Sequence, residues 1–319
     1  MSWHLLVTGS LFTTSRTFAV GALSPPYFRL GIPSSDTPVY RDFVSECRHR
    51  FRSDGVLHIP EFLPTDICRA LTEEAESHFS DPSCVFRSTE SHTVYQAEVD
   101  GSYSRGHPRN ALQRSSKSIV DYDRLDDETS PLRALYWSED FFTFVRDVVS
   151  SGDDINPPAP LYRSACPYNA AYYNLYAEGD GLGWHFDSGE FGVNLVLGMP
   201  DEGGVFELHK GTRAPGDLWS FDTVWSILHR NNPETNDCVP EQATELTAVD
   251  NASPGSLILF AGAHNMHRVT PVVGPNPRIN AIVHFEQSAG RRVGAYSLRK
   301  FFGREGTVRP EVAQRGRIC

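Results

Sequence analysis

Residues 174–208 read "NLYAEGDGLGWHFDSGEFGVNLVLGMPDEGGVFEL", and this stretch decides the fold class. Apolar and aromatic residues occur here in short runs, and each run ends at glycine, proline, asparagine or aspartate. Runs of this length, bounded by turn-forming residues, are typical of β-strands. The stretch therefore predicts several short strands in succession.

The same pattern continues over most of the chain after the proline-rich sequence at 156–160. Further runs are "AAYYNLYAE", "DLWSF", "SLILFAG", "HRVTPVV" and "NAIVHFEQ". Short strands at this spacing favour a sandwich or a jelly-roll barrel, because closure removes exposed strand edges. We expect an α+β, mainly β fold: a double-stranded β-helix (jelly-roll, cupin-like) core with N-terminal helices packed on it.

Helices are expected in the first half of the chain. Residues 39–78 predict a helix, an Asp-Gly turn, the strand "VLHI" and a second helix near Pro64, with Thr65 or Asp66 as its N-cap. Residues 131–149 have a helical period with an aromatic face, which predicts a helix that packs on the core. The polar segment 80–130 is expected to form loops, and 226–254 a long insertion between strands, helical in part.

These patterns predict a single domain over residues 36–295, with a helical N-terminal part (36–158) and a jelly-roll core (160–287). Residues 1–35 contain no acidic residue and are rich in Ser and Thr, which is typical of an organelle transit peptide or of a frayed terminus. Residues 296–319 are expected to form a basic tail. The protein is expected to be intracellular, either cytoplasmic or in an organelle.

Composition excludes several classes of protein. No run approaches the ~18 apolar residues of a membrane span. The formal net charge of -11 repels phosphate backbones, so a nucleic acid is not the expected partner. The six cysteines are scattered without a Cys-x-x-Cys pair, which predicts free thiols and not a zinc ribbon or a disulfide framework.

Within "GWHFDSGEF" (183–191), His185 and Asp187 stand two residues apart beside a glycine-rich turn. An imidazole and a carboxylate from one strand end can bind the same metal if a distant histidine completes the set. That is the 2-His-1-carboxylate arrangement, which leaves coordination positions open on Fe(II). On its own, this pair is weak evidence for a metal site, since a chain with 12 histidines and many aspartates can contain such a pair by chance.

The flanking sequence strengthens the metal interpretation. Asn174 and Tyr176 precede the pair, a Gly-Gly-x-Phe turn follows it, and His267 opens "HRVTPV", with Arg278 eleven residues later. This order resembles the Fe(II)/2-oxoglutarate-dependent dioxygenase superfamily across residues 160–287, and residues 51–76 also resemble the beginning of many members. "GWHFDSGEFGVNLVLGMPDEGGVFE" is similar to the branch that contains halogenases and hydroxylases of free amino acids.

The resemblance implies a role for each matching residue. His185, Asp187 and His267 would bind Fe(II), and Arg278 would bind the distal carboxylate of 2-oxoglutarate through its planar guanidinium. Asn174 and Tyr176 would hydrogen-bond the same cosubstrate. His264 competes for the third ligand position, but only His267 stands in the family pattern.

The implied reaction is an oxidation by O2, with 2-oxoglutarate as cosubstrate and succinate and CO2 as co-products. Halogenating relatives carry a small residue in place of the carboxylate ligand, so Asp187 favours hydroxylation. Nucleic-acid-repair members carry a second arginine after the first, whereas "RINAIVHF" has none. Related prolyl hydroxylases commonly use lysine where this chain has Arg278.

The expected substrate is a small molecule, with a free amino acid as one candidate, and the sequence gives no oligomeric state. Residues 93–110 and 219–245 are the expected lid over the metal. Charged residues that could contact an amino acid there or nearby are Glu98, Glu190, Arg105 and Arg109. Two alternatives stay open: a non-catalytic cupin-like binding protein, and a zinc hydrolase that uses the same three ligands with water.

Overall fold

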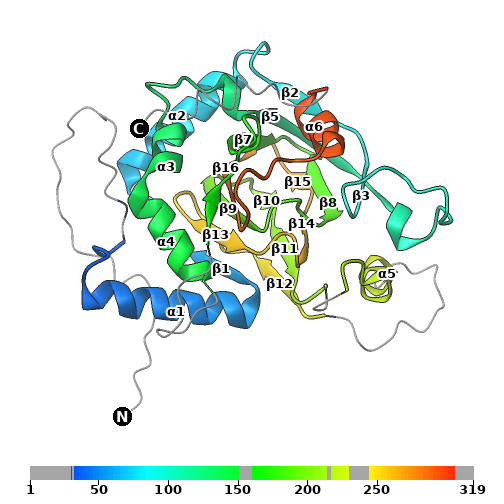
Figure 1. Ribbon diagram of the computed structural model, residues 1–319. Coiled ribbons are helices and arrows are strands. Elements are labelled where there is room, and N and C mark those ends of the chain that lie inside the picture. Colours follow the sequence, from blue (N-terminus) through cyan, green and yellow to red (C-terminus); the bar gives the residue numbers. More distant parts are fainter. Residues whose placement is uncertain (1–29, 31, 151–159, 214–216, 230–243, 306–319) are drawn as a thin grey trace.

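The computed structural model describes residues 30, 32–150, 160–213, 217–229 and 244–305. An antiparallel sheet curls into a nearly closed barrel, and helices cover one side of it (Figure 1). The order of the main strands is β1-β13-β9-β16-β7-β5-β8-β14-β11-β12, while β2 pairs with β5 and β6 with β16. This is the expected mainly β jelly-roll core with helices packed on it.

The elements have the following bounds. The strands are β1 (Val56–Ile59), β2 (Phe86–Ser88), β3 (His92–Thr93), β4 (Leu112–Gln113), β5 (Ser115–Val120), β6 (Tyr162–Arg163), β7 (Ala171–Tyr176), β8 (Gly181–His185), β9 (Phe191–Gly198), β10 (Glu202–Gly203), β11 (Phe206–His209), β12 (Leu246–Val249), β13 (Leu257–Phe260), β14 (Met266–Val269), β15 (Val272–Val273) and β16 (Arg278–Glu286). The helices are α1 (Pro38–Asp54), α2 (Thr65–Phe79), α3 (Pro131–Trp137), α4 (Glu139–Val149), α5 (Phe221–His229) and α6 (Ala295–Phe302), with 3-10 turns at Pro108–Asn110 and Tyr122–Arg124.

The barrel has two walls. The major wall contains β1, β13, β9, β16 and β7, and the minor wall contains β8, β14, β11 and β12. Strand β5 joins them, since it pairs with β7 on one wall and β8 on the other. Strand β1 extends the major wall by pairing with β13. The helical N-terminal part of the chain therefore also contributes strands to the barrel.

The hydrophobic core lies between the major wall and helices α1 to α4. Alternate residues of β16 point to opposite sides of the sheet, and its helix-facing row packs into this core. From the helices come residues such as Leu71, Leu135 and Phe144, all at 0% exposure. Burial of each such side chain contributes about 1.5–3 kcal/mol, so this layer holds the major wall in place.

Local sequence explains where several helices begin and end. The Thr37 hydroxyl accepts a hydrogen bond from the Tyr40 amide at 3.2 Å, and Pro38 opens α1. Gly55 ends α1 with a φ of 73°, a left-handed conformation that glycine adopts without strain. Residues 131–149 form two helices and not one, because Ser138 leaves the helical conformation and caps α4 by accepting from the Phe141 amide at 3.3 Å.

Three expectations from the sequence were wrong in detail. Neither Thr65 nor Asp66 caps α2, which begins at Thr65 after Pro64 without a side-chain cap. "DLWSF" is not a strand, because the Asp217 carboxylate accepts hydrogen bonds from the amides of residues 219 and 220 and forms a turn into α5. The segment 80–130 contains loops but also β5, which is central to the barrel.

The chain after residue 294 begins with a helix. Leu298, Phe301 and Phe302 of α6 are buried against the barrel near β2 and β5 (Figure 1). The transit-like segment expected at 1–35 and the end of the expected tail fall largely on residues outside the described part of the chain.

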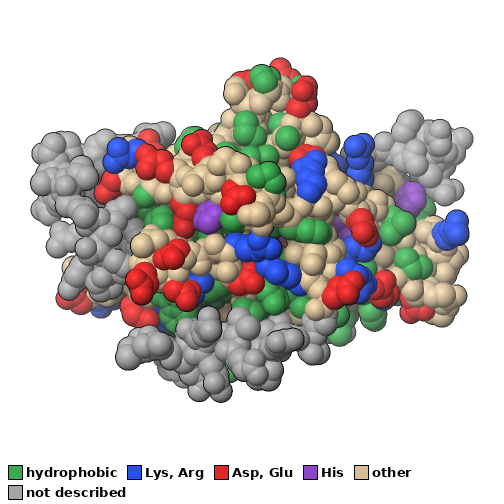
Figure 2. All heavy atoms as spheres, turned by 90° about the horizontal axis from the view of Figure 1, so that it is seen from above, with side chains coloured by type: hydrophobic (Ala, Val, Ile, Leu, Met, Phe, Trp, Pro, Cys, Tyr) green, Lys and Arg blue, Asp and Glu red, His purple; other side chains and the backbone are tan. Residues whose placement is uncertain are grey.

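On the face in Figure 2, acidic and basic side chains lie intermixed. Within the described residues, no helix is long and apolar enough to cross a membrane. The described cysteines Cys47, Cys68, Cys84 and Cys166 are free thiols, as the sequence predicts.

Candidate active site

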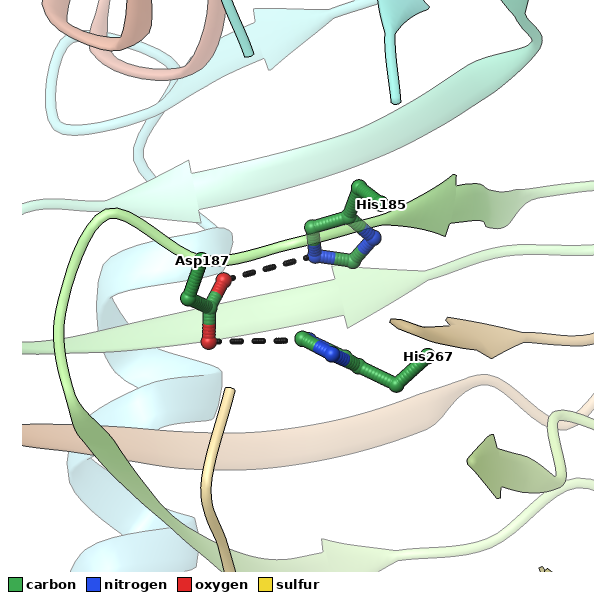
Figure 3. Close-up of side chains that lie close together, drawn as sticks. All are labelled: His185, Asp187 and His267. Carbon is green, nitrogen blue, oxygen red and sulfur yellow. Dashed lines mark ion pairs between the residues drawn. The ribbon is translucent and has the colours of Figure 1, made fainter. Parts of the chain in front are cut away.

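Two adjacent strands of the minor wall bring a histidine-aspartate-histidine group together (Figure 3). His185 ends β8, Asp187 follows it, and His267 on β14 pairs directly with His185 in the strand register. The Nε2 atoms of His185 and His267 lie 3.4 and 3.5 Å from the two carboxylate oxygens of Asp187. One donor atom from each of the three residues lies within 4.8 Å of the others, so the group could hold one metal ion.

Backbone carbonyls fix the orientation of both imidazole rings. The Nδ1 atom of His185 lies 2.9 Å from the carbonyl oxygen of Gly183, and Nδ1 of His267 lies 2.9 Å from that of Asn265. A carbonyl only accepts, so each Nδ1 carries the proton and donates it. In the neutral form of either ring, Nε2 then has the lone pair and faces Asp187, which is the tautomer that a metal ligand requires.

The charges at this group favour metal binding. Burial lowers the pKa of His185, and the neighbouring His267 lowers it further, so the ring is neutral at physiological pH. Burial also opposes ionisation of Asp187, but His267 and His185 outweigh it and hold the pKa of this carboxyl well below its usual range. The site therefore presents an ionised carboxylate next to the neutral imidazole of His185.

A glycine makes room for the carboxylate. The amide of Asp187 donates to the carbonyl of Gly262 at 2.9 Å, so the loop after β13 runs directly against the site. A Cβ atom on Gly262 would lie 2.9 Å from the Cβ of Asp187 and closer still to one carboxylate oxygen. A residue with a side chain at position 262 would displace the carboxylate.

A cavity lies between the two walls beside these three residues. The inward row of β16 contributes Asn280, Ile282 and His284 to its lining, and β7 contributes Tyr172, Asn174 and Tyr176. The Nδ2 atom of Asn280 donates to Oδ1 of Asn194 at 2.8 Å. The Oδ1 atoms of Asn174 and Asn280 are buried and have no hydrogen-bond partner among the described residues.

Arg278 begins the inward row of β16, two residues before Asn280. It is 1% exposed and lies over the Tyr176 ring, with its guanidinium carbon 5.6 Å from the ring centre. Its Nε and Nη1 atoms are buried without a hydrogen-bond partner in the described part of the chain. Burying the donors of a charged group without partners costs free energy, so we expect this guanidinium to pair with an anion.

The Gly-Gly turn leaves space for Arg278. Gly203 and Gly204 both have positive φ values, 71° and 61°. A Cβ atom on Gly204 would lie 3.1 Å from Cδ of Arg278. The turn thus serves both the backbone path from β10 to β11 and the position of the arginine.

The residues assigned from the sequence to the metal and the cosubstrate lie together: five of them line the cavity, and Arg278 lies against Tyr176, which is one of the five. The competing ligand His264 and the four charged residues named for the substrate do not line the cavity among the described residues. His264 is 59% exposed in its side chain and hydrogen-bonds Glu190 at 3.0 Å, outside the metal-ligating group. Glu190 also pairs with Arg291, while Arg109 lies over Trp219. Among the described residues, none of Glu98, Glu190, Arg105 and Arg109 lines the cavity.

The two expected lid segments pack against each other. The hydroxyl of Tyr95 donates to the carbonyl of Trp219, and the rings of Tyr95 and Phe221 lie 5.8 Å apart. Tyr95 also contacts Phe186, which stands between the histidine and the aspartate of the site. Residues 230–243 of the second segment lie outside the described residues.

Lys117 and His284 are among the polar residues of the cavity that sequence reasoning missed. His284 lies in the "RINAIVHF" run, and its even spacing from Arg278 and Asn280 along the strand places it on the inward row. Lys117 lies in "SSKSIV", where alternation of polar and apolar residues is too weak to predict the strand that carries it.

Comparison with known proteins finds similar folds among solved structures. No family model and no curated protein matches the sequence. Among solved structures, AviO1 from Streptomyces viridochromogenes Tue57 is 15% identical, with a TM-score of 0.50 over 78% of this chain and 97% of that one. At this identity, the likeness shows a shared fold and leaves the activity to be argued from the site.

Other similar structures include an oxidoreductase of the 2OG-Fe(II) oxygenase family from Burkholderia pseudomallei, 13% identical, with a TM-score of 0.46 over 77% of this chain and 92% of that one. EctD from S. alaskensis, solved with 2-oxoglutarate and 5-hydroxyectoine, is 14% identical, with a TM-score of 0.45 over 80% of this chain and 78% of that one. The similarity to the amino-acid halogenase branch stays a prediction from the sequence.

Proposed function

We propose that the protein is an Fe(II)- and 2-oxoglutarate-dependent oxygenase that hydroxylates a small organic molecule, with succinate and CO2 as co-products. One observation carries this proposal. The fold buries a metal-ligating group of two histidines and an aspartate on one wall, and on the facing wall an arginine that has no counter-ion among the described residues.

The donor set fits Fe(II). His185, Asp187 and His267 supply two imidazole nitrogens and a carboxylate oxygen from one side, which leaves the other side of an octahedral ion open. With its pKa held low, Asp187 supplies a negative charge to the ion over the whole physiological range. Because Asp187 is a carboxylate and not a small residue, no ligand position is left for a halide, which favours hydroxylation.

The arginine fits 2-oxoglutarate. Two donors of the Arg278 guanidinium lack partners within the part of the chain that the structure describes. A carboxylate can accept two parallel hydrogen bonds from a guanidinium. Tyr176 packs on the arginine and orients it, while Asn174 and Asn280 offer further polar atoms along the cavity. Under this proposal, 2-oxoglutarate contacts the metal ion with one end and Arg278 with the other.

When bound, iron and 2-oxoglutarate supply the activation of O2 for attack on a carbon–hydrogen bond. The residues of the chain position the reactants and exclude water. Apolar side chains that line the cavity near His267 include Phe206, Phe260 and Val269. This lining keeps bulk water from the reacting atoms.

Neither of the two alternative functions explains why Arg278 is buried in this position. A zinc hydrolase would use the three ligands and a water, but a buried arginine with unpaired donors serves no purpose in that reaction. A cupin-like binding protein would not need the complete metal-ligating group.

The proposal is tested by anaerobic titration of the apoprotein with Fe(II) and then 2-oxoglutarate, followed by the weak visible charge-transfer band of the chelate. We expect the band in the native protein and its loss in His267→Ala. Arg278→Leu should weaken 2-oxoglutarate binding by about 10- to 100-fold and leave Fe(II) affinity unchanged. Tight zinc binding with no charge-transfer band would contradict the proposal and favour a hydrolase.

A further inference from the structure

A single lysine lies inside the cavity. Lys117 is on β5, the strand that joins the two walls, and is 4% exposed. Its Nζ atom lies 5.5 Å from the ring centre of Phe301 on α6, 5.8 Å from that of Tyr172 and 6.0 Å from that of Tyr176. Lys117 lines the cavity together with these three aromatic residues, so its ammonium is enclosed by rings.

Lys117 has no anionic partner in the described part of the chain, where no carboxylate oxygen lies within 4.0 Å of its Nζ atom. The chain holds only three lysines, and the other two lie at the surface: Lys300 pairs with Glu90, and Lys210 contacts the carbonyl of Ser53. Burial lowers the pKa of Lys117 to about 8, Asp187 opposes this shift and Arg278 adds to it. A buried, unpaired ammonium is costly, which indicates that it serves a ligand.

Counting charges identifies which ligand is still missing, and this step rests on the proposed function. The two positive charges of Fe(II) and the one of Arg278 balance the one negative charge of Asp187 and the two of 2-oxoglutarate. The loaded cavity would then be neutral without Lys117. The ammonium of Lys117 is one positive charge in excess, in a place that water reaches poorly.

We propose that Lys117 binds a carboxylate of the substrate, so that the enzyme acts on a small organic acid. A substrate with one free carboxylate neutralises the excess charge, and its carbon chain can pack on Tyr172 and Phe301, which flank the ammonium. Lysine suits this task, because its compact charge accepts a carboxylate in several orientations, whereas arginine favours a fixed bidentate one. A free amino acid is one member of this class.

The test uses acetate as a minimal carboxylate and acetamide as its neutral counterpart. The full-length protein is loaded with Mn(II) in place of Fe(II) and with saturating 2-oxoglutarate. The binding of ¹³C-labelled acetate is then followed by the relaxation that the paramagnetic ion causes. This readout does not depend on turnover or on knowledge of the true substrate.

We expect the native protein to relax acetate but not acetamide. Lys117→Met should weaken acetate binding by at least about tenfold, while Lys117→Arg restores it in part. Lys300→Met removes a surface lysine and is the matched control, with no effect expected. Affinities for Mn(II) and 2-oxoglutarate should stay within about twofold in all three variants. Thermal melts check folding, and Lys117→Met should not destabilise the protein, because methionine replaces an unpaired charge.

Several results would overturn the inference. The inference is wrong if acetate shows no relaxation in the native protein, if it binds equally well to Lys117→Met, or if acetamide is relaxed to the same extent. If Lys117→Met weakens 2-oxoglutarate instead of acetate, the lysine serves the cosubstrate and the inference is wrong. These failures differ from failure of the proposed function, in which Mn(II) itself does not bind to the native protein and both proposals fall.

Discussion

The two faces of the major wall are both buried, yet they differ in chemistry. On the helix-facing side, β16 presents Ile279, Ala281, Val283 and Phe285, all apolar and packed in one hydrophobic cluster with the helices. On the cavity side, the same strand presents Arg278, Asn280 and His284, and each has a buried polar atom without a partner among the described residues. One row of β16 side chains thus stabilises the fold, and the other row offers polar atoms that can bind ligands.

This contrast shows where function resides. Unpaired polar atoms inside a protein are destabilising, and they persist where a ligand pairs with them. On β16, unpaired polar atoms lie on the cavity side and not on the core side. This difference distinguishes the cavity from the core more clearly than burial does, because both sides are buried.

The largest expected effect comes from the helix-facing row. Phe285 is fully buried among Tyr136, Phe141 and Phe142. Phe285→Ala should lower the free energy of unfolding by about 3–5 kcal/mol, because it leaves a cavity between the sheet and α3 and α4. Urea denaturation measures this loss. A loss below about 1 kcal/mol would mean that this side of the wall does not carry the stability assigned to it.

The next largest effect is a pH dependence of the protein's stability, which arises from Glu286 at the other end of the inward row of β16. Glu286 is 3% exposed, and burial raises its pKa from 4.5 to about 7, although Arg291 lies 3.6 Å away and opposes the shift. A carboxyl with a raised native pKa favours folding below its unfolded pKa, and this contribution is lost as the pH rises through the native value. Stability should therefore fall between about pH 4.5 and 7.

Glu286→Gln removes this titration. The variant should be more stable than the native protein at pH 8, by on the order of 1–3 kcal/mol, and equal to it at pH 4. Urea denaturation at the two pH values tests this, and an equal difference at both would show that Glu286 does not titrate as the structure indicates.

Gly262→Ala tests how tightly the metal-ligating group is packed. The added Cβ would press on the Asp187 side chain, so metal affinity should fall by about 10- to 100-fold while the protein remains folded. Gly106→Ala is the control, since a Cβ atom there would meet nothing within 4 Å. Mn(II) titration by electron paramagnetic resonance gives both affinities, and equal values would show that Asp187 tolerates the added atom.

The smallest effect is expected at His264. Its hydrogen bond to Glu190 is largely exposed, so His264→Ala should change stability by less than about 1 kcal/mol and leave metal affinity unaltered. His267→Ala, three residues away, should abolish metal binding. Comparable losses of metal in the two variants would place His264 at the ion after all.

Much of this architecture follows from sequence, because strands with both faces buried carry strong patterns. The runs at 171–176, 191–198 and 278–286 all lie where the apolar pattern predicts strands. The resemblance of the flanking motifs to a known family marked His185, Asp187 and His267 as one group, and the structure places them together.

The remainder depends on contacts that no local pattern contains. Strand β5 has four polar residues among six, and only its pairing with β7 and β8 keeps it extended. The turn at Asp217 depends on side-chain hydrogen bonds that override a run of apolar residues. Lys117 was overlooked for the same reason as its strand, since its inward direction follows from strand pairing.

Helix α6 has a consequence for how the cavity is made. Ser297, Phe301 and Phe302 line the cavity, and they follow every strand of the barrel in the chain. During synthesis, the metal-ligating group and Arg278 emerge from the ribosome before the helix that covers Lys117. The nascent barrel is therefore open on that side until α6 arrives, and the ammonium is enclosed only after the strands have been made.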